Sequence, residues 1–237
     1  MKTIGIIGGM SWQSTVIYYQ QINEAVQHRL GGHHSAQIIL YSVDFARIVA
    51  HQHQGDWDGA TEILVRAATS LRDGGAELLI IATNTMHLMA DAVIAASGLP
   101  LVHIADATAA AMISSGVRRP LLLATAFTME EEFYKGRLKT RHGLDPVIPS
   151  PEDRADVHRI IYDELCQGKI MPPSRAAMQA IISRHAAECD SVILGCTEIT
   201  MLIRQQDTDL PVFDTTRLHA EAAVAHALDD ESEGTAT

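Results

Sequence analysis

The sequence predicts an α/β protein made of two similar domains, each with a small, mostly parallel sheet covered by helices. Short β-branched runs alternate with longer helical stretches, which is typical of parallel sheets with helices on both faces. Three sequence features of the first half recur in the second half in the same order, at offsets of 117, 113 and 111 residues. The 237 residues are 47% hydrophobic and 20% charged. These values suit one large or two small globular domains and exclude a disordered, collagen-like or coiled-coil protein.

Glycines mark the element boundaries expected in the first half. Gly8 and Gly9 end the first strand, and Gly98 stops the last helix before the middle of the chain. Ser14 is the expected N-cap of the first helix. The expected strands cover residues 3–7, 38–43, 78–82 and 101–104, and the expected helices cover residues 14–29, 61–72 and 88–96.

The second half repeats this alternation. TIGIIGGM from Thr3 corresponds to PLLLATAF from Pro120, and LLIIATNT, which contains Thr83, corresponds to SVILGCTE, which contains Cys196. The third repeated feature is Leu99-Pro100, which corresponds to Leu210-Pro211. Repeats in the same order indicate duplicated domains. The expected strands are 121–124, 146–148, 191–194 and 212–213, and the expected helices are 130–140, 155–166 and 174–188. We expect a first domain of residues 1–104 plus 212–237, a second of residues 105–211, and a disordered acidic tail at 229–237.

Charge and cysteine content exclude several classes of function. The formal charge is −11, from 29 acidic and 18 basic residues, which disfavours nucleic acid and anionic membranes as partners. No apolar run approaches the roughly 20 residues of a membrane span, and the N-terminus lacks the pattern of a signal peptide. The three cysteines form no CxxC pair, so neither a disulfide framework nor a structural zinc site is expected. A reduced, cytoplasmic protein is the resulting prediction.

The ends of two buried strands carry the residues with the most reactive chemistry. Ligands of parallel sheets bind beyond the carboxyl ends of the strands, so two facing domains would place Thr83 and Cys196 on opposite sides of one cleft. Cys196 also stands at an expected helix N-terminus, where the dipole would lower the pKa of its thiol. The alternative is a buried structural cysteine, the role that suits Cys166 and Cys189. A threonine hydroxyl is a weak base, so Thr83 could instead cap the following helix.

Other sequence signals are weaker. GIIGGMSW is neither GxGxxG nor a Walker loop, although its glycines would let backbone N–H groups approach an anion. Arg47 and Arg137 are candidates to hold a distal carboxylate, or are solvated. The histidines that could suggest a metal are better explained as exposed polar residues, because no second ligand cluster accompanies them: His33, His34, His51 and His53.

The motifs GGMSW, NTMH at the third strand end, TxxTM from Thr125 and GCTE at Cys196 resemble the aspartate/glutamate racemase family. The similarity runs from Met1 to about Leu228 and is greatest to the broad-specificity amino-acid racemases of enterobacterial type. It implies two pseudo-symmetric domains with the active site in the cleft between them, a homodimer, and a small amino acid, aspartate or glutamate, as substrate. It also implies catalysis without pyridoxal phosphate, metal or nucleotide.

The resemblance further implies roles for individual residues. In the family one thiolate removes the α-proton and a thiol opposite returns a proton to the other face. By position, Cys196 is the base on the L-side, while Thr83 stands where most members have the first cysteine. Asn84, Thr85 and Thr197 match groups that hold the α-carboxylate. The other implied substrate-binding residues are Met10, Gln52, Thr125, Thr128 and Glu198.

The replacement of a cysteine by Thr83 leaves two other interpretations. One is a single-cysteine decarboxylase or isomerase of the same superfamily, in which Cys196 alone handles the proton. The other is a catalytically weak protein that binds a ligand. Thr83 could protonate the carbanion directly or through a water, and a weak Thr83 would slow both directions, because L and D enantiomers have equal free energy.

Overall fold

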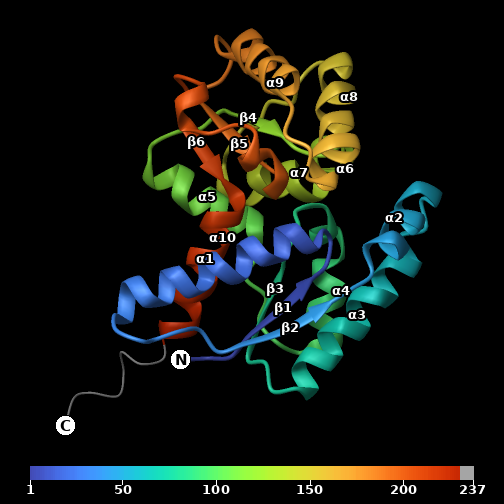
Figure 1. Ribbon diagram of the computed structural model, residues 1–237, viewed down its shortest axis with the longest axis vertical. Coiled ribbons are helices and arrows are strands. Elements are labelled where there is room, and N and C mark those ends of the chain that lie inside the picture. Colours follow the sequence, from blue (N-terminus) through green and yellow to red (C-terminus); the bar gives the residue numbers. More distant parts are fainter. Residues whose placement is uncertain (230–237) are drawn as a thin grey trace. The chain divides into compact units, whose positions relative to one another are not determined.

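The computed structural model describes residues 1–229 and divides into two units (Figure 1). The first unit comprises Met1–His103 and the chain from His219 onward, and the second comprises Ile104–Leu218. The chain therefore crosses between the units twice, after residue 103 and after residue 218. The tail expected at residues 229–237 lies, apart from Asp229, outside the described residues.

The first unit is built on a parallel sheet with the strand order β2-β1-β3. Its central strand is buried along its whole length, so its side chains pack against helices on both faces. One face is covered by α1 and α10, through residues such as Tyr18 and Val224, and the other by α3 and α4, through Leu64 and Val93. The strands are β1 (Ile4–Gly8), β2 (Ile38–Ser42) and β3 (Leu78–Ile81), and the helices are α1 (Trp12–Leu30), α2 (Phe45–Gln54), α3 (Trp57–Asp73), the 3₁₀ helix η1 (Thr85–Met89), α4 (Ala90–Ser97) and α10 (Thr215–Leu228), whose first residues belong to the second unit.

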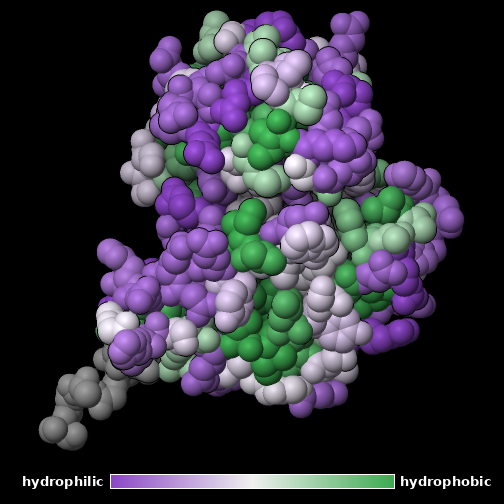
Figure 2. Space-filling model, in the orientation of Figure 1, coloured by the Kyte–Doolittle hydropathy of each residue, from purple (hydrophilic) through white to green (hydrophobic). Residues whose placement is uncertain are grey.

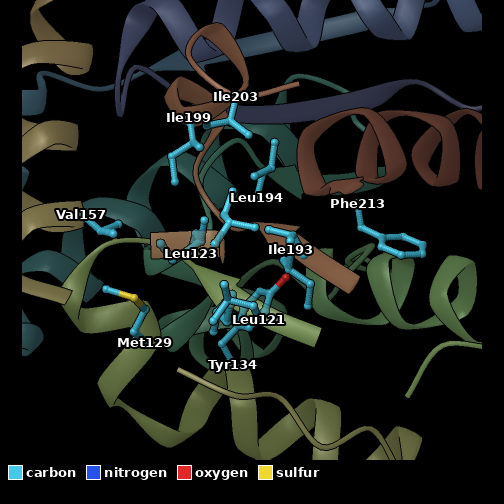
Figure 3. Packing of buried hydrophobic residues seen from close by; sticks show 14 of the residues in the cluster. Leu121, Leu123, Met129, Tyr134, Val157, Ile193, Leu194, Ile199, Ile203 and Phe213 are labelled. Carbon is cyan, nitrogen blue, oxygen red and sulfur yellow. The ribbon is translucent and has the colours of Figure 1, made fainter. Parts of the chain in front are cut away.

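The second unit has a parallel sheet with the strand order β4-β5-β6. Figure 3 shows side chains of its core, where Leu121 and Ile193 lie beside Tyr134. Burying each Leu or Ile of this kind contributes roughly 1.5–3 kcal/mol. The strands are β4 (Pro120–Leu123), β5 (Ser191–Leu194) and β6 (Val212–Asp214), and the helices are α5 (Ile104–Ser114), α6 (Ala126–Glu130), α7 (Glu132–His142), α8 (Pro151–Arg159), the π-helical η2 (Ile160–Glu164), η3 (Leu165–Gln167), α9 (Pro172–His185), η4 (Thr197–Met201) and η5 (Gln205–Asp207).

The two sheets have matching topologies, as the internal repeat predicts. In the first unit Leu101 forms a single parallel bridge beyond β3, and in the second Val147 forms one beyond β4. The orders β2-β1-β3-Leu101 and Val147-β4-β5-β6 therefore correspond position by position. The repeat pairs β1 with β4 and β3 with β5, so the α/β architecture of two small parallel sheets is confirmed.

Several expected boundaries are wrong. The strand expected at 101–104 is only the bridge at Leu101, because Ile104 already begins α5. The N-cap of α1 is Ser11, whose hydroxyl accepts from the Ser14 N–H, and not Ser14. The helix expected at 155–166 ends as α8 at Arg159 and continues as the π-helical η2 and the 3₁₀ helix η3. Helices α2, α5, α6 and α10 were not expected from the sequence.

The expected domain boundary at residue 212 also differs from the structure. Residues 212–218 belong to the second unit, because β6 pairs with β5 at Ile193 and Phe213. The chain re-enters the first unit only at His219, within α10. Among the described residues, no helix is long and apolar enough to cross a membrane.

Candidate active site

The carboxyl edge of the first sheet holds Thr83 in a tight loop. The Thr83 N–H donates to the Ile81 carbonyl at 2.8 Å, and the Thr83 carbonyl accepts from Nδ1 of His87 at 2.8 Å. One residue earlier, the Ala82 carbonyl accepts from the Ser14 hydroxyl at 3.3 Å. Thr83 itself is half-buried. Side chains therefore hold the two successive carbonyl groups of Ala82 and Thr83.

Asn84 and Thr85 follow directly and are both buried, with 3% and 5% of their surface exposed. They begin the five-residue 3₁₀ helix η1, of which Asn84 is the N-cap. The Asn84 carbonyl accepts from the His87 N–H at 3.1 Å. The expected α-carboxylate ligands of the first unit thus lie next to Thr83 at the same strand end.

The loop after β1 explains the glycines of GGM. Gly9 has φ +89°, and a Cβ there would lie 2.3 Å from the Val43 carbonyl oxygen, so only glycine fits. Its N–H donates to the Thr15 hydroxyl at 2.7 Å, and that hydroxyl donates to the Ser11 carbonyl. The Gly9 N–H is therefore already hydrogen-bonded inside the protein. It does not serve as one of the backbone N–H groups that were expected to approach an anion.

Met10 and Gln52 lie in the buried layer of the same unit. Each is 5% exposed, and Nε2 of Gln52 lies 3.4 Å from Sδ of Met86. Gln52 reaches this layer from α2, a helix that was not expected from the sequence.

Cys196 follows the buried strand β5 and Gly195 in the second unit. A Cβ on Gly195 would lie 3.0 Å from the Ala124 methyl group, so glycine allows β5 and β4 to end close together. Cys196 is the N-cap of the 3₁₀ helix η4, and its Sγ donates to Oε2 of Glu198 at 3.0 Å. Glu198 is 4% exposed. A thiol and a carboxylate thus form a hydrogen-bonded pair at the strand end.

The pKa of the Cys196 thiol is raised well above its usual value, first by burial and then by the negative charge of Glu198. The expectation that a helix dipole lowers this pKa is therefore wrong. The helix has only five residues, and the neighbouring carboxylate opposes a second negative charge. In the protein without substrate, Cys196 is a thiol that donates to Glu198.

The other two cysteines suit structural positions. Burial raises the pKa of the Cys166 thiol to about 12 and that of the Cys189 thiol to about 11. All three cysteines are free thiols. The structural alternative for Cys166 and Cys189 is therefore consistent with their surroundings.

The remaining predicted residues of the second unit lie at the ends of β4 and β5. Thr125 caps α6, and its hydroxyl lies 3.2 Å from the Thr128 hydroxyl. Thr197 accepts a hydrogen bond from the Thr216 hydroxyl at 3.0 Å. Thr216 was not expected as a site residue from the sequence, although it follows β6 as Thr83 follows β3. The expected strand stopped at Phe213, so the strand-end signal at Asp214-Thr215-Thr216 was not used.

Tyr162 is a second residue of the site that was not expected from the sequence. It lies on the π-helical η2, a type of turn that is frequent at functional sites. Burial raises the pKa of its phenol, and negative charge at Cys196, Cys166 and Glu198 raises it further. Its ring packs on His158 at a centroid distance of 4.6 Å, and Nδ1 of His158 accepts from the Ala126 N–H in the Thr125 loop. No periodicity in the sequence identifies this tyrosine.

The two candidate arginines have different surroundings. Arg137 forms a two-point ion pair with Asp106, at 2.7 and 2.6 Å, which ties α7 to α5. Arg47 is exposed on the first turn of α2 and lines a small surface pocket of about 110 Å³ together with Arg66 and Tyr41. Arg137 is thus engaged by Asp106, whereas Arg47 stands at the carboxyl edge of the first sheet.

The histidines that could suggest a metal site are not arranged as one. Nδ1 of His51 lies 2.8 Å from Oδ2 of Asp56, the residue that caps α3. Within residues 1–229, no three His, Cys, Asp or Glu side chains form a group suited to a metal ion.

Comparison with known proteins gives consistent results. Residues 7–223 match the family model for Asp/Glu/hydantoin racemases. The broad specificity amino-acid racemase RacX of Bacillus subtilis (strain 168) is 22% identical over 95% of this chain and 98% of its own. The crystal structure of a candidate Asp/Glu racemase from Yersinia pestis is 52% identical, with a TM-score of 0.90, and the match covers 96% of this chain and 100% of that one. An aspartate racemase homologue from Pyrococcus horikoshii OT3 is 36% identical, with a TM-score of 0.83, over 96% and 99% of the two chains.

Proposed function

We propose a mechanism from the premise that the chain belongs to the Asp/Glu/hydantoin racemase family, which makes it an amino-acid racemase. It acts on aspartate or glutamate, removes the proton from Cα and returns a proton to the opposite face, and needs no cofactor. The observation that carries the proposal is the hydrogen bond from Cys196 to Glu198 at the end of β5. This pair supplies both a proton carrier and an acceptor for its proton.

On the L-side, Glu198 takes the proton of the Cys196 thiol as the substrate binds. The thiolate then removes the α-proton: the Cα–H bond breaks, an S–H bond forms, and the electron pair moves onto the α-carboxylate as an enediolate. Because the carboxylate and the thiol lie 3.0 Å apart, only one of them needs to carry negative charge at a time. Burial disfavours a permanent thiolate at Cys196 in the protein without substrate. It does not prevent a thiolate from forming transiently when Glu198 takes the proton.

The enediolate needs hydrogen-bond donors where its negative charge develops. Asn84 and Thr85 of the first unit and Thr197 of the second are the proposed partners of the substrate α-carboxylate. All three are almost completely buried, which strengthens any hydrogen bond they make to an anion. Met10, Gln52, Thr125 and Thr128 are proposed to shape the pocket around the substrate.

Thr83 serves the opposite face of the substrate. Its hydroxyl, or a water bound to it, returns a proton to Cα of the enediolate: the O–H bond breaks and a new Cα–H bond forms on this face. The alkoxide or hydroxide that is left takes up a proton from solvent, and Glu198 releases the proton it took from Cys196, which restores the starting state. Since the two enantiomers have equal free energy, the weak acid at this position lowers kcat/KM equally in both directions. Exchange of the α-proton of the L-enantiomer at Cys196 should therefore be faster than inversion.

Arg47 is proposed to recognise the side-chain carboxylate of the substrate. It is exposed at the same sheet edge as Thr83, whereas the alternative, Arg137, is engaged by Asp106. A guanidinium binds a carboxylate through two parallel hydrogen bonds, which favours aspartate and glutamate over neutral amino acids.

We further propose that the enzyme acts in the cytoplasm as a homodimer. Its three free thiols suit a reducing compartment. On α1, Trp12, Val16 and Tyr19 are each more than half exposed, and Leu40 on the edge strand β2 is 46% exposed. Figure 2 shows pale and green atoms where β2 and the first turns of α1 lie in Figure 1, whereas the rest of α1 is mostly purple. Such a face suits the self-complementary contact of a twofold dimer.

The function is tested by incubating the protein with L- and D-aspartate, L- and D-glutamate and a panel of neutral amino acids in deuterium oxide. Chiral chromatography measures inversion, and proton NMR measures loss of the α-proton signal. Inversion of an acidic amino acid, unaffected by exhaustive chelation, is the expected result. A decarboxylase would show neither process on amino acids, and a binding protein would show only occupancy.

A further inference from the structure

Behind the Thr83 loop lies a cluster of three buried histidines, His87, His103 and His219, which are 2%, 7% and 0% exposed. The His87 ring lies 4.6 Å from the His103 ring and 5.5 Å from the His219 ring, centroid to centroid. Tyr18 of α1 completes the cluster, with its ring 5.6 Å from that of His219. Histidine is costly to bury unless its ring nitrogens are hydrogen-bonded, so an apolar residue would fill this space more cheaply.

The hydrogen bonds fix which ring nitrogens carry protons. Nε2 of His219 lies 2.7 Å from the Val102 carbonyl oxygen, which only accepts, so Nε2 carries a proton. Nδ1 of the neutral His219 ring then accepts from the Tyr18 hydroxyl at 2.8 Å. By the same reasoning, Nδ1 of His87 carries a proton and donates to the Thr83 carbonyl. Burial lowers the pKa of both histidines, which keeps the rings neutral.

Two members of the cluster stand at the points where the chain changes units. His103 is the last residue of the first segment of the first unit, and His219 is the first residue after the chain returns. The ring of His87 packs against both of them. A single side chain therefore touches both crossover residues and, through Nδ1, the carbonyl of Thr83.

We infer that His87 is a positioning residue for Thr83: its Nδ1–H holds the Thr83 carbonyl, while His103 and His219 hold its ring. This inference rests on the proposed role of Thr83. Proton transfer by a hydroxyl depends strongly on its placement relative to Cα, and a displacement of about 1 Å can cost about 100-fold in rate. The proton return to the face served by Thr83 should therefore depend on His87, whereas proton exchange at Cys196 should not.

The test compares two rates in the same sample, inversion of L-aspartate or L-glutamate and deuterium exchange at its Cα. His87→Ala removes the donor and should lower inversion by about 10- to 100-fold, while exchange stays within about threefold of the wild type. His87→Asn places an amide N–H near the position of Nδ1–H and should recover most of the lost inversion. Val93→Ala, which removes buried volume from α4 of the same unit, is the matched control and should leave the ratio of inversion to exchange unchanged.

The inference would be overturned if His87→Ala kept the wild-type ratio of inversion to exchange. It would also be overturned if Val93→Ala lowered this ratio as much as His87→Ala does. A measurement that needs no variant to fold is the long-range ¹H–¹⁵N NMR spectrum of the wild-type histidines. It should show His87 protonated at Nδ1 and His219 at Nε2, and a His87 proton at Nε2 alone would overturn the inference. If instead the wild type catalyses neither exchange nor inversion, the proposed function fails while the NMR result still reports on the hydrogen bond.

Discussion

The thiol of Cys196 donates to the carboxylate of Glu198 across 3.0 Å, at the end of the buried strand β5. Burial raises the pKa of the thiol, and the negative charge of the carboxylate raises it further. The proposed base is therefore stored as a neutral thiol beside the group that can deprotonate it. A cysteine of this kind resists alkylation at neutral pH in the absence of substrate.

Cys196 should react slowly with alkylating agents at neutral pH. In a Cys166→Ala/Cys189→Ala background, the rate of iodoacetamide alkylation should rise only at a pH well above 9, because the thiolate is the reacting form. Glu198→Gln should move this rise to lower pH, since it removes the negative charge that opposes the thiolate. Mass spectrometry of the alkylated peptide measures the rate. Rapid alkylation of the original protein at pH 7 would contradict the assignment of a resting thiol.

Glu198→Gln should also slow catalysis, although it makes the thiolate easier to form. The amide cannot take the thiol proton, so deuterium exchange at Cα of the L-substrate should fall by about 100-fold, the usual lower range for loss of a general base. Glu188→Gln, a change at an exposed carboxylate of the same unit, is the control. A variant whose exchange rate equals that of the wild type would show that Glu198 only fills space.

Thr83→Cys should raise kcat/KM for inversion of the L and D enantiomers by the same factor, because no substitution alters an equilibrium constant of one. The new thiol is a far stronger acid than the hydroxyl it replaces. Thr83→Ala should abolish inversion and leave exchange of the L-enantiomer in place. If Thr83→Ala inverts its substrate at the wild-type rate, Thr83 is a wall of the pocket and a water serves that face.

Tyr162→Phe removes a partly buried phenol hydroxyl on which the charges of Cys196 and Glu198 act. The charges of Cys196 and Glu198 act on this phenol, so its hydroxyl dipole should help to stabilise the negative charge that moves between them, and its loss should lower kcat by about tenfold with little change in KM. Tyr134→Phe, which removes a buried phenol hydroxyl from the core of the same unit, is the matched control. An unchanged kcat in Tyr162→Phe would show that this residue only packs against His158.

Stability should fall as the pH drops below 6.5. His219 has a pKa lowered by burial to about 4 in the folded protein, and the pKa of His87 is also well below 6.5. As the pH falls, the histidines of the unfolded chain, which titrate near 6.5, take up protons before those of the folded protein. The contribution of the neutral buried histidines to the free energy of unfolding is therefore fully present only above pH 6.5 and is lost below it. Between pH 6.5 and its pKa in the folded protein, each such histidine lowers the free energy of unfolding by about 1.4 kcal/mol for each unit by which the pH falls.

Guanidinium denaturation at pH 7.0, 5.5 and 4.5 measures this effect. His219→Gln should reduce the slope of stability against pH by about one proton, whereas His33→Gln, at an exposed position, should leave the slope unchanged. A slope of zero between pH 6.5 and 4.5 in the original protein would mean that the buried histidines are not neutral.

The sequence was sufficient to predict the architecture because buried parallel strands are short, apolar and bounded by glycine. β5 was predicted with its exact bounds, and the internal repeat identified the corresponding strand ends at Thr83 and Cys196. Helix α10 was missed because its periodicity is weak, and with it the contact of Thr216 to Thr197. The direction of the pKa shift of the Cys196 thiol was predicted wrongly. The prediction considered only the dipole at a helix N-terminus and not the negative charge of Glu198 two residues away.

The residues that surround these strand ends could not be found by pattern. Tyr162 lies on the π-helical turn η2, which follows α8 and leads into the 3₁₀ helix η3. His87, His103 and His219 come together from three distant segments, and each in isolation looks like an ordinary buried histidine. Such clusters depend on tertiary packing, and periodicity carries no information about them.

The most direct test of the account is the deuterium content of Cα in L-aspartate and L-glutamate after incubation with Cys196→Ser, beside the unchanged protein. A serine hydroxyl is too weak an acid to be deprotonated by Glu198, so exchange and inversion should both fall by several orders of magnitude. Cys166→Ala and Cys189→Ala should remain within a few-fold of the original rates. Near-normal exchange in Cys196→Ser would contradict the central claim that this thiol moves the α-proton.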